Sequence, residues 1–135
     1  MNPESVIDDS IVEKLISAAA SAREQAYAPY SDYKVGAALL AEDDSIYRGC
    51  NVENASYGLT ICAERNAVGA AVLEGKRRFK AIAIVSDDDP PATPCGACRQ
   101  VLVQFGNNIM VVTANLKGHR KDFMLSDLIP HVFDL

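Results

Sequence analysis

The chain has 135 residues, 49% of them hydrophobic, a common size for one domain with a buried core. Its net charge of −5 opposes binding to polyanions, so we expect no nucleic-acid partner. No run approaches the ~18 apolar residues that cross a membrane, and the start, Met1–Ser10, is polar and acidic rather than a targeting signal. We therefore expect a single domain over residues 1–135 that is soluble and cytoplasmic.

The first predicted elements are a helix and a hairpin. Ser10-Ile11-Val12-Glu13 forms a capping-box pattern, and the apolar spacing after it predicts a helix of about fifteen residues that ends near Ala28, before Pro29. The apolar run 34–41 and the extended segment 46–50 are separated by turn residues. They predict two strands joined as a hairpin.

Helices and strands alternate over the rest of the chain. Cys62–Glu74 is predicted to be a buried helix closed by Gly75, and Cys95–Phe105 a second helix closed by Gly106. Short apolar runs predict strands at Phe79–Val85 and Ile109–Thr113.

The C-terminal part is predicted to add an edge strand at Lys121–Met124 and a last turn capped at Ser126. The run Asp87–Asp89 beside two prolines is predicted to be a solvated loop and not a cation site. We therefore expect an α/β fold with three layers, α/β/α, in which helices cover a mixed sheet of about five strands.

Four cysteines without an export signal indicate metal binding or catalysis rather than disulfides. In Pro94-Cys95-Gly96-Ala97-Cys98, two thiols three residues apart at a helix start can converge on one ion. The helix N-terminus favours thiolate there. By itself this motif also fits a redox dithiol or half of a zinc knuckle.

A third thiol, Cys62, begins another helix, and Glu64 follows two residues later. Two such residues on a regular helix point nearly opposite ways. Both side chains reach one pocket only if Cys62 lies at the irregular first position. Three thiolates would leave one coordination position open, which is typical of a catalytic zinc ion, one per chain. The remaining candidates are assigned other roles: His119 to a turn, His131 to the surface and Cys50 to apolar packing.

These residues resemble the signature of the cytidine and deoxycytidylate deaminase superfamily, a ligand-x-Glu paired with Pro-Cys-x-x-Cys. Cysteine as the first ligand narrows the resemblance to the small nucleoside cytidine deaminases. The matching segments span nearly the whole chain: 26–31, 35–38, 49–55 and 128–130.

The resemblance implies a zinc-dependent hydrolysis of cytidine and deoxycytidine to uridine and deoxyuridine, with release of ammonia, in pyrimidine salvage. It implies that zinc held by Cys62, Cys95 and Cys98 activates a water molecule. It assigns the proton transfers to Glu64, which does not touch the metal. Arg65, three residues after Cys62, would donate hydrogen bonds to the thiolates and offset their charge, although a plain surface position is the alternative.

The resemblance also assigns substrate contacts. It makes Asn51 and Glu53 the pair that hydrogen-bonds the ribose, and the carboxylate would repel a 3'-phosphate, which favours a free nucleoside. Ala55 would offer backbone groups to the base. Tyr33 stands where the family more often carries phenylalanine near the pyrimidine, with core packing as the alternative. Phe133 would reach a neighbour's pocket in a homotetramer with shared active sites, or serve as plain tail packing.

Two rival functions remain at this point. Blasticidin S deaminase shares the zinc motifs but replaces the ribose-binding glutamate, so Glu53 argues against it. A non-catalytic, zinc-stabilised interaction module would have no need of Glu64, so that residue argues against the second rival.

Overall fold

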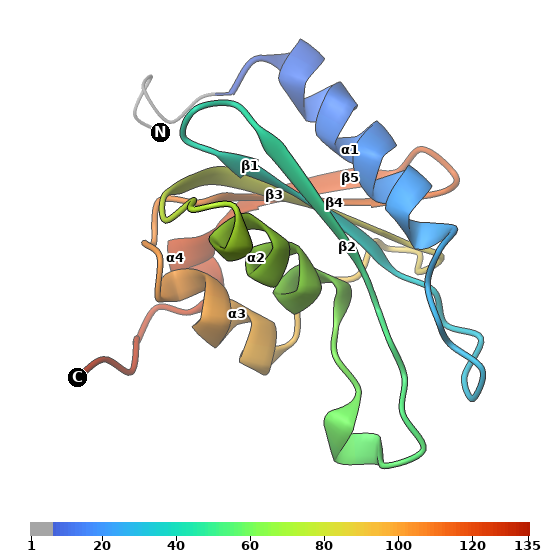
Figure 1. The fold of residues 1–135 in the computed structure, drawn as a ribbon. Helices are drawn as coiled ribbons and strands as arrows, with labels where there is room; N and C mark the ends of the chain where they lie inside the picture. The colour runs from blue at the N-terminus through green and yellow to red at the C-terminus, as the bar shows by residue number, and fades with distance from the viewer. Residues whose placement is uncertain (1–6) are drawn as a thin grey trace.

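The computed structural model describes residues 7–135, so part of the polar start Met1–Ser10 lies outside the described residues. Five strands form one sheet in the order β2-β1-β3-β4-β5. Helix α1 covers one face of the sheet, and α2, α3 and α4 cover the other (Figure 1). The expected three-layer α/β architecture with a mixed sheet of five strands is confirmed.

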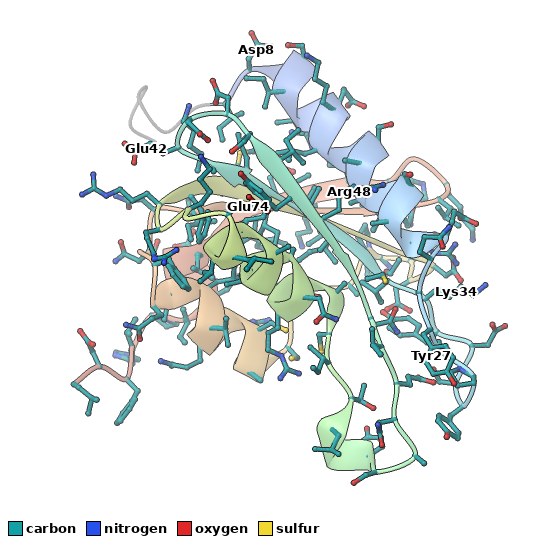
Figure 2. All side chains as sticks on the ribbon, in the orientation of Figure 1. Asp8, Tyr27, Lys34, Glu42, Arg48 and Glu74 are labelled. Carbon is teal, nitrogen blue, oxygen red and sulfur yellow. The ribbon has the colours of Figure 1, made fainter. Side chains whose placement is uncertain are left out.

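Helix α1 spans Asp9–Arg23, and its length of 15 residues agrees with the prediction, but both predicted ends are wrong. The cap is Asp8, whose side chain accepts a hydrogen bond from the Ser10 backbone N at 2.7 Å. A carboxylate at the cap satisfies one of the free N–H groups of the first turn. The helix ends before the predicted Ala28 because the backbone of Tyr27 pairs with the segment after β2. Tyr27 is labelled in Figure 2.

The strands confirm the predicted order of elements. Their bounds are β1 Gly36–Ala41, β2 Ile46–Cys50, β3 Phe79–Ser86, β4 Met110–Asn115 and β5 Arg120–Met124. Strand β1 is antiparallel to β2 and β3, whereas β3 and β4 are parallel, and β5 is antiparallel to β4. It follows that β2, β3 and β4 run in one direction and end at the same edge of the sheet. The loops that lead to α2 and α3 start at this edge.

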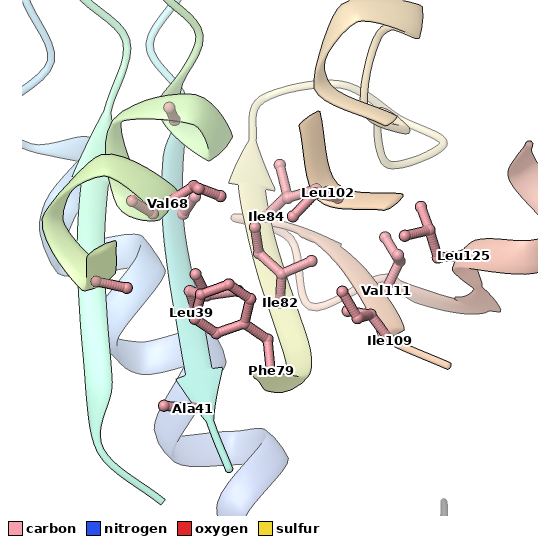
Figure 3. Close-up of a cluster of buried hydrophobic side chains, with 14 of the residues drawn as sticks. Leu39, Ala41, Val68, Phe79, Ile82, Ile84, Leu102, Ile109, Val111 and Leu125 are labelled. Atoms are coloured by element: carbon pink, nitrogen blue, oxygen red, sulfur yellow. The ribbon is translucent and has the colours of Figure 1, made fainter. Parts of the chain in front are cut away.

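Alternate side chains of the central strands fill two cores. On the α2 and α3 side, Leu39, Ile82 and Ile84 pack with Leu102, as Figure 3 shows. On the α1 side the strand residues are smaller, and mostly alanine and valine pack against Val12 and its helix neighbours. Burial of these apolar side chains, worth roughly 25 cal/mol per Å², is the main force that holds the layers together.

The remaining helices are α2 Ala63–Leu73, α3 Gly96–Val103, the short α4 Leu125–Leu128 and the 3-10 turn η2 Tyr57–Leu59. Gly75 and Gly106 follow α2 and α3 with φ angles of 84° and 127°, which confirms the predicted glycine stops. The last turn is not capped by Ser126, since its N-cap is Met124. The segment 51–61, which contains η2, projects from the body of the fold (Figure 1). Within residues 7–135, no helix is both long and apolar enough to span a bilayer.

Candidate metal centre and active site

Cys62 and Cys95 occupy the N-cap positions of α2 and α3. Both have extended backbone, with ψ angles of 155° and 169°, and within the described residues neither side chain caps its helix. Their Sγ atoms lie 3.9 Å apart. Cys98 joins them from the first turn of α3, and all three sulfurs lie within 4.8 Å of one another. In the part of the chain that the structure describes, this is the one such group of potential metal ligands.

The three thiols fit zinc. Soft thiolate ligands select zinc over magnesium or calcium, and three of them leave the fourth tetrahedral position open. Hydrogen bonds from the Cys98 thiol, and then from Arg65, lower the pKa of Cys62 to about 5. The hydrogen bond to Cys62 and burial raise the pKa of the Cys98 thiol. One thiolate thus forms readily in the free cluster, and a bound cation would ionise the others.

Glu64 is the second residue of α2 and is 5% exposed. The position of Cys62 at the cap allows both side chains to serve one site, as the sequence required. Burial raises the pKa of the Glu64 carboxyl above its ordinary value, and the negative charge at Cys62 adds to this. A carboxyl with a raised pKa can hold and release a proton nearer to neutral pH, which suits general acid-base catalysis.

Arg65 contacts the cluster as its spacing predicted. Its Nη2 donates to the Cys62 Sγ at 3.6 Å, and this interaction raises the pKa of the guanidinium. Its buried Nε has no hydrogen-bond partner among the described residues. The guanidinium therefore places a permanent positive charge beside the thiolates.

Arg99 is a structural residue that the sequence analysis missed. Its guanidinium donates to the carbonyl oxygens of Pro94 at 2.7 Å and Leu128 at 2.8 Å, and to the Thr93 hydroxyl at 3.1 Å. These bonds fix the segment that ends at Cys95 against the C-terminal part of the chain. The position of Arg99, directly after the second thiol of the motif, could have indicated a role near the metal centre. Its hydrogen bond to the Leu128 carbonyl is seen only in the folded structure.

Asn51 and Glu53 both hold the loop that precedes β1. The Asn51 side chain, in a residue only 7% exposed, accepts from the Val35 N at 2.9 Å and donates to the Tyr33 carbonyl at 2.7 Å. The Glu53 carboxylate accepts from the Tyr30 N at 3.0 Å. It also accepts from both the backbone N and the hydroxyl of the next residue, Ser31, and the hydroxyl bond lowers its pKa.

The three other predicted substrate residues are exposed. Ala55 is in the projecting segment between β2 and α2. Phe133 is 72% exposed on the C-terminal tail, which Gln100 of α3 holds through a hydrogen bond to the Phe133 carbonyl at 3.1 Å. Tyr33 is 38% exposed, and its hydroxyl donates to Asp88 at 2.6 Å.

The residues assigned to other roles lie outside the cluster. Cys50 is half-buried at the end of β2, and its carbonyl accepts from Asn66 at 2.8 Å. His131 is exposed, and His119 pairs with Asp89 at 2.9 Å. The predicted solvated loop at 87–89 is confirmed, since all three of its residues are exposed, and each of its carboxylates is also paired within the chain.

Comparison with known proteins places these features in a family. Residues 9–114 match the family described as the cytidine and deoxycytidylate deaminase zinc-binding region. A cytidine deaminase of Sporosarcina psychrophila is 54% identical over 90% of each chain, and one of Halalkalibacterium halodurans is 50% identical over 90% of this chain and 92% of its own.

Solved structures agree with the sequence matches. A crystal structure of cytidine deaminase from Burkholderia pseudomallei has a TM-score of 0.87 and 50% identity, and covers 90% of this chain and 98% of its own. The enzyme from Mycobacterium tuberculosis has a TM-score of 0.82 and 39% identity, with 96% of this chain and all of its own covered. With its three converging thiols and the buried glutamate beside them, this chain belongs to the zinc-binding cytidine and deoxycytidylate deaminase family.

Proposed function

We propose that this protein hydrolyses cytidine and deoxycytidine to uridine and deoxyuridine, with release of ammonia. The observation that carries the proposal is the buried carboxyl of Glu64 in the same helical turn as Cys62 of the three-thiol cluster. Relatives that are about half identical over most of the chain and are named cytidine deaminase support the same substrate.

The three thiols and Glu64 divide the chemistry between them. A zinc ion bound by Cys62, Cys95 and Cys98 would supply Lewis-acid activation of a water molecule, one ion per chain. Glu64 takes the proton from this water as its oxygen adds to C4 of the pyrimidine, and passes that proton to N3. The same carboxyl then carries the second proton of the water to the departing amine, so the products are the uracil nucleoside and ammonia. The raised pKa of Glu64 suits a group that must both accept and donate.

Three neighbouring side chains support this reaction. Arg65 offsets the negative charge of the thiolates by donating to Cys62. Asn51 and Glu53 bind the ribose hydroxyls: the Asn51 amide retains a second N–H beyond the one given to the Tyr33 carbonyl. The carboxylate of Glu53 favours a free nucleoside over a 3'-phosphate by charge. Ala55 would contribute backbone groups, and Tyr33 an aromatic face, to the base.

We propose that the chain is one domain over residues 1–135 and works as a homotetramer, with Phe133 entering a neighbour's site. Large apolar side chains at the surface support assembly: Tyr57 is 92% exposed, Leu59 64% and Phe133 72%. Sedimentation of the parent and a Phe133→Ala variant tests this. A fully active monomer would exclude a shared site. We also propose a cytoplasmic role in pyrimidine salvage, which four free cysteines support.

The deciding experiment follows the loss of cytidine absorbance on addition of purified protein, with and without a chelator, and measures ammonia in parallel. We expect turnover of cytidine and deoxycytidine that is lost with the metal. Blasticidin S serves as the competing substrate. Turnover of blasticidin S without turnover of cytidine, or zinc-loaded protein that releases no ammonia, would contradict the proposal.

A further inference from the structure

A hydrogen bond between Tyr33 and Asp88 joins two segments that are 55 residues apart in the sequence. The Tyr33 hydroxyl donates to Oδ2 of Asp88 at 2.6 Å. Tyr33 lies in the loop before β1, and Asp88 lies in the loop that leads from the end of β3 to Cys95. The bond therefore connects Tyr33, a proposed contact of the pyrimidine, with the loop that leads to Cys95, a candidate metal ligand.

The backbone of Tyr33 is fixed on both sides of its side chain. Its N–H donates to the Ser31 hydroxyl oxygen at 3.0 Å, and its carbonyl accepts from the Asn51 amide at 2.7 Å. The Ser31 hydroxyl in turn donates to Glu53. Because the backbone is held, the contacts of the hydroxyl, with the Asp88 carboxylate and the Ser86 hydroxyl, select the direction of the ring.

The ring stands within the electrostatic reach of the reaction site. Burial, the bond to Asp88 and the charge of Glu64 together raise the pKa of Tyr33 to about 12. The phenol therefore stays protonated, and remains a donor to Asp88, near neutral pH and well above it.

Asp88 is itself held in place. Its carbonyl accepts from the side-chain amide of Asn115 at 3.1 Å, and its N–H donates to the Ser86 hydroxyl oxygen at 3.3 Å. Asn115 is 6% exposed at the end of β4, so this support comes from the rigid edge of the sheet. The adjacent Asp89 points elsewhere, to His119 at 2.9 Å.

We propose that Asp88 is a positioning residue for substrate binding, which, supported by Asn115, holds the Tyr33 ring in its binding direction before the pyrimidine arrives. This inference rests on the proposed function. A ring that is already fixed loses little rotamer freedom when the base packs against it, so its contact contributes more to affinity. Phenylalanine at this position would have no hydroxyl for Asp88 to hold.

Steady-state kinetics with cytidine test the proposal in Asp88→Ala, Tyr33→Phe and the double variant. Alanine removes the acceptor of the bond, whereas asparagine would keep one. We expect each single change to raise KM about fivefold with kcat within about twofold, which corresponds to the loss of roughly one hydrogen bond. The double variant should be no worse than either single variant, because both remove the same bond. Asp89→Ala is the matched control, the same change one residue away, and should leave KM within about twofold of the parent.

A second measurement reports the bond without turnover. Spectrophotometric titration of tyrosine between about pH 9 and 12, compared with Tyr33→Phe, isolates the Tyr33 phenol. Its ionisation should move to lower pH in Asp88→Ala and stay in place in Asp89→Ala. An unchanged KM in Asp88→Ala, an additive effect in the double variant, or an equal effect of Asp89→Ala would overturn the inference. If the parent still turned over cytidine, the proposed function would stand. A zinc-loaded parent without cytidine turnover would overturn both, whatever the phenol titration shows.

Discussion

Cys62 and Cys95 occupy the same position in two different helices, the N-cap, and this places their sulfur atoms 3.9 Å apart. The two helices meet there because β2 and β3, which precede them, end at the same edge of the sheet. At each cap the positive end of a helix dipole faces the thiol, which favours its ionised form. The pairing of two helix starts therefore makes the centre suitable for a cation.

Removal of the metal should abolish turnover and lower the melting temperature, because ligand binding to the folded state stabilises it. Cys95→Ala should bind less than one zinc per chain and lose activity. Cys50→Ala is the control, since Cys50 lies outside the cluster. Metal analysis and thermal unfolding with and without chelator measure both effects. Full zinc and activity in Cys95→Ala would remove that residue from the centre.

Glu64→Gln should keep the fold and about one zinc per chain but lose at least ~100-fold in kcat, since an amide of the same shape cannot relay protons. Kinetics and metal analysis on the same preparation separate chemistry from metal loss. A variant that deaminates cytidine within about tenfold of the parent would show that Glu64 is not the proton carrier.

The same substitution should show a pH-dependent effect on stability in the metal-free protein. Burial raises the pKa of Glu64 in the folded state, so its protonated form stabilises the fold at low pH, and this contribution is lost as the pH rises through the folded pKa. Glu64→Gln is neutral throughout. The variant should therefore gain stability relative to the parent as the pH rises above about 4.3, the ordinary pKa of a glutamate. Urea unfolding at several pH values measures the difference, and a constant difference would contradict the raised pKa.

Arg65→Gln should hold zinc at least as firmly but slow turnover near neutral pH. The loss of the guanidinium leaves the thiolates with more negative charge, which opposes the formation of hydroxide from water at the site. The acid limb of the pH-rate profile should then move to higher pH. Profiles from about pH 5 to 9 on both proteins test this. If Arg65 is only a surface charge, neither the limb nor the rate will change.

Gly49→Ala should lower the free energy of unfolding by about 1–3 kcal/mol, as overpacking does. A Cβ at Gly49 would lie 2.4 Å from the Ala63 carbonyl oxygen and from the Ala67 N, so β2 and α2 would have to separate. Gly69→Ala, in α2 but with open space around it, is the control and should be neutral or stabilising by up to ~1 kcal/mol. Chemical denaturation measures both, and equal effects would contradict this packing argument.

The sequence by itself determined the order of the elements, the three-layer fold and the chemistry of the centre. Apolar runs and helical spacing depend on local patterning, and three cysteines with a glutamate define a donor set before any folding. The same local reasoning failed at the end of α1, where a bridge between Tyr27 and Val52 replaces the predicted turns of helix.

Only the tertiary structure decided which distant groups meet. Asp87–Asp89 is the exposed loop that the sequence predicted, but only the fold shows that its central carboxylate binds the Tyr33 hydroxyl. In the same way, the Arg99 guanidinium binds the carbonyl of Leu128. Such contacts join residues on different strands and loops, and their energy is realised only after the sheet has brought its edges together. No local sequence pattern predicts these contacts, because neither residue of a pair determines which residue types stand next to it in the sequence.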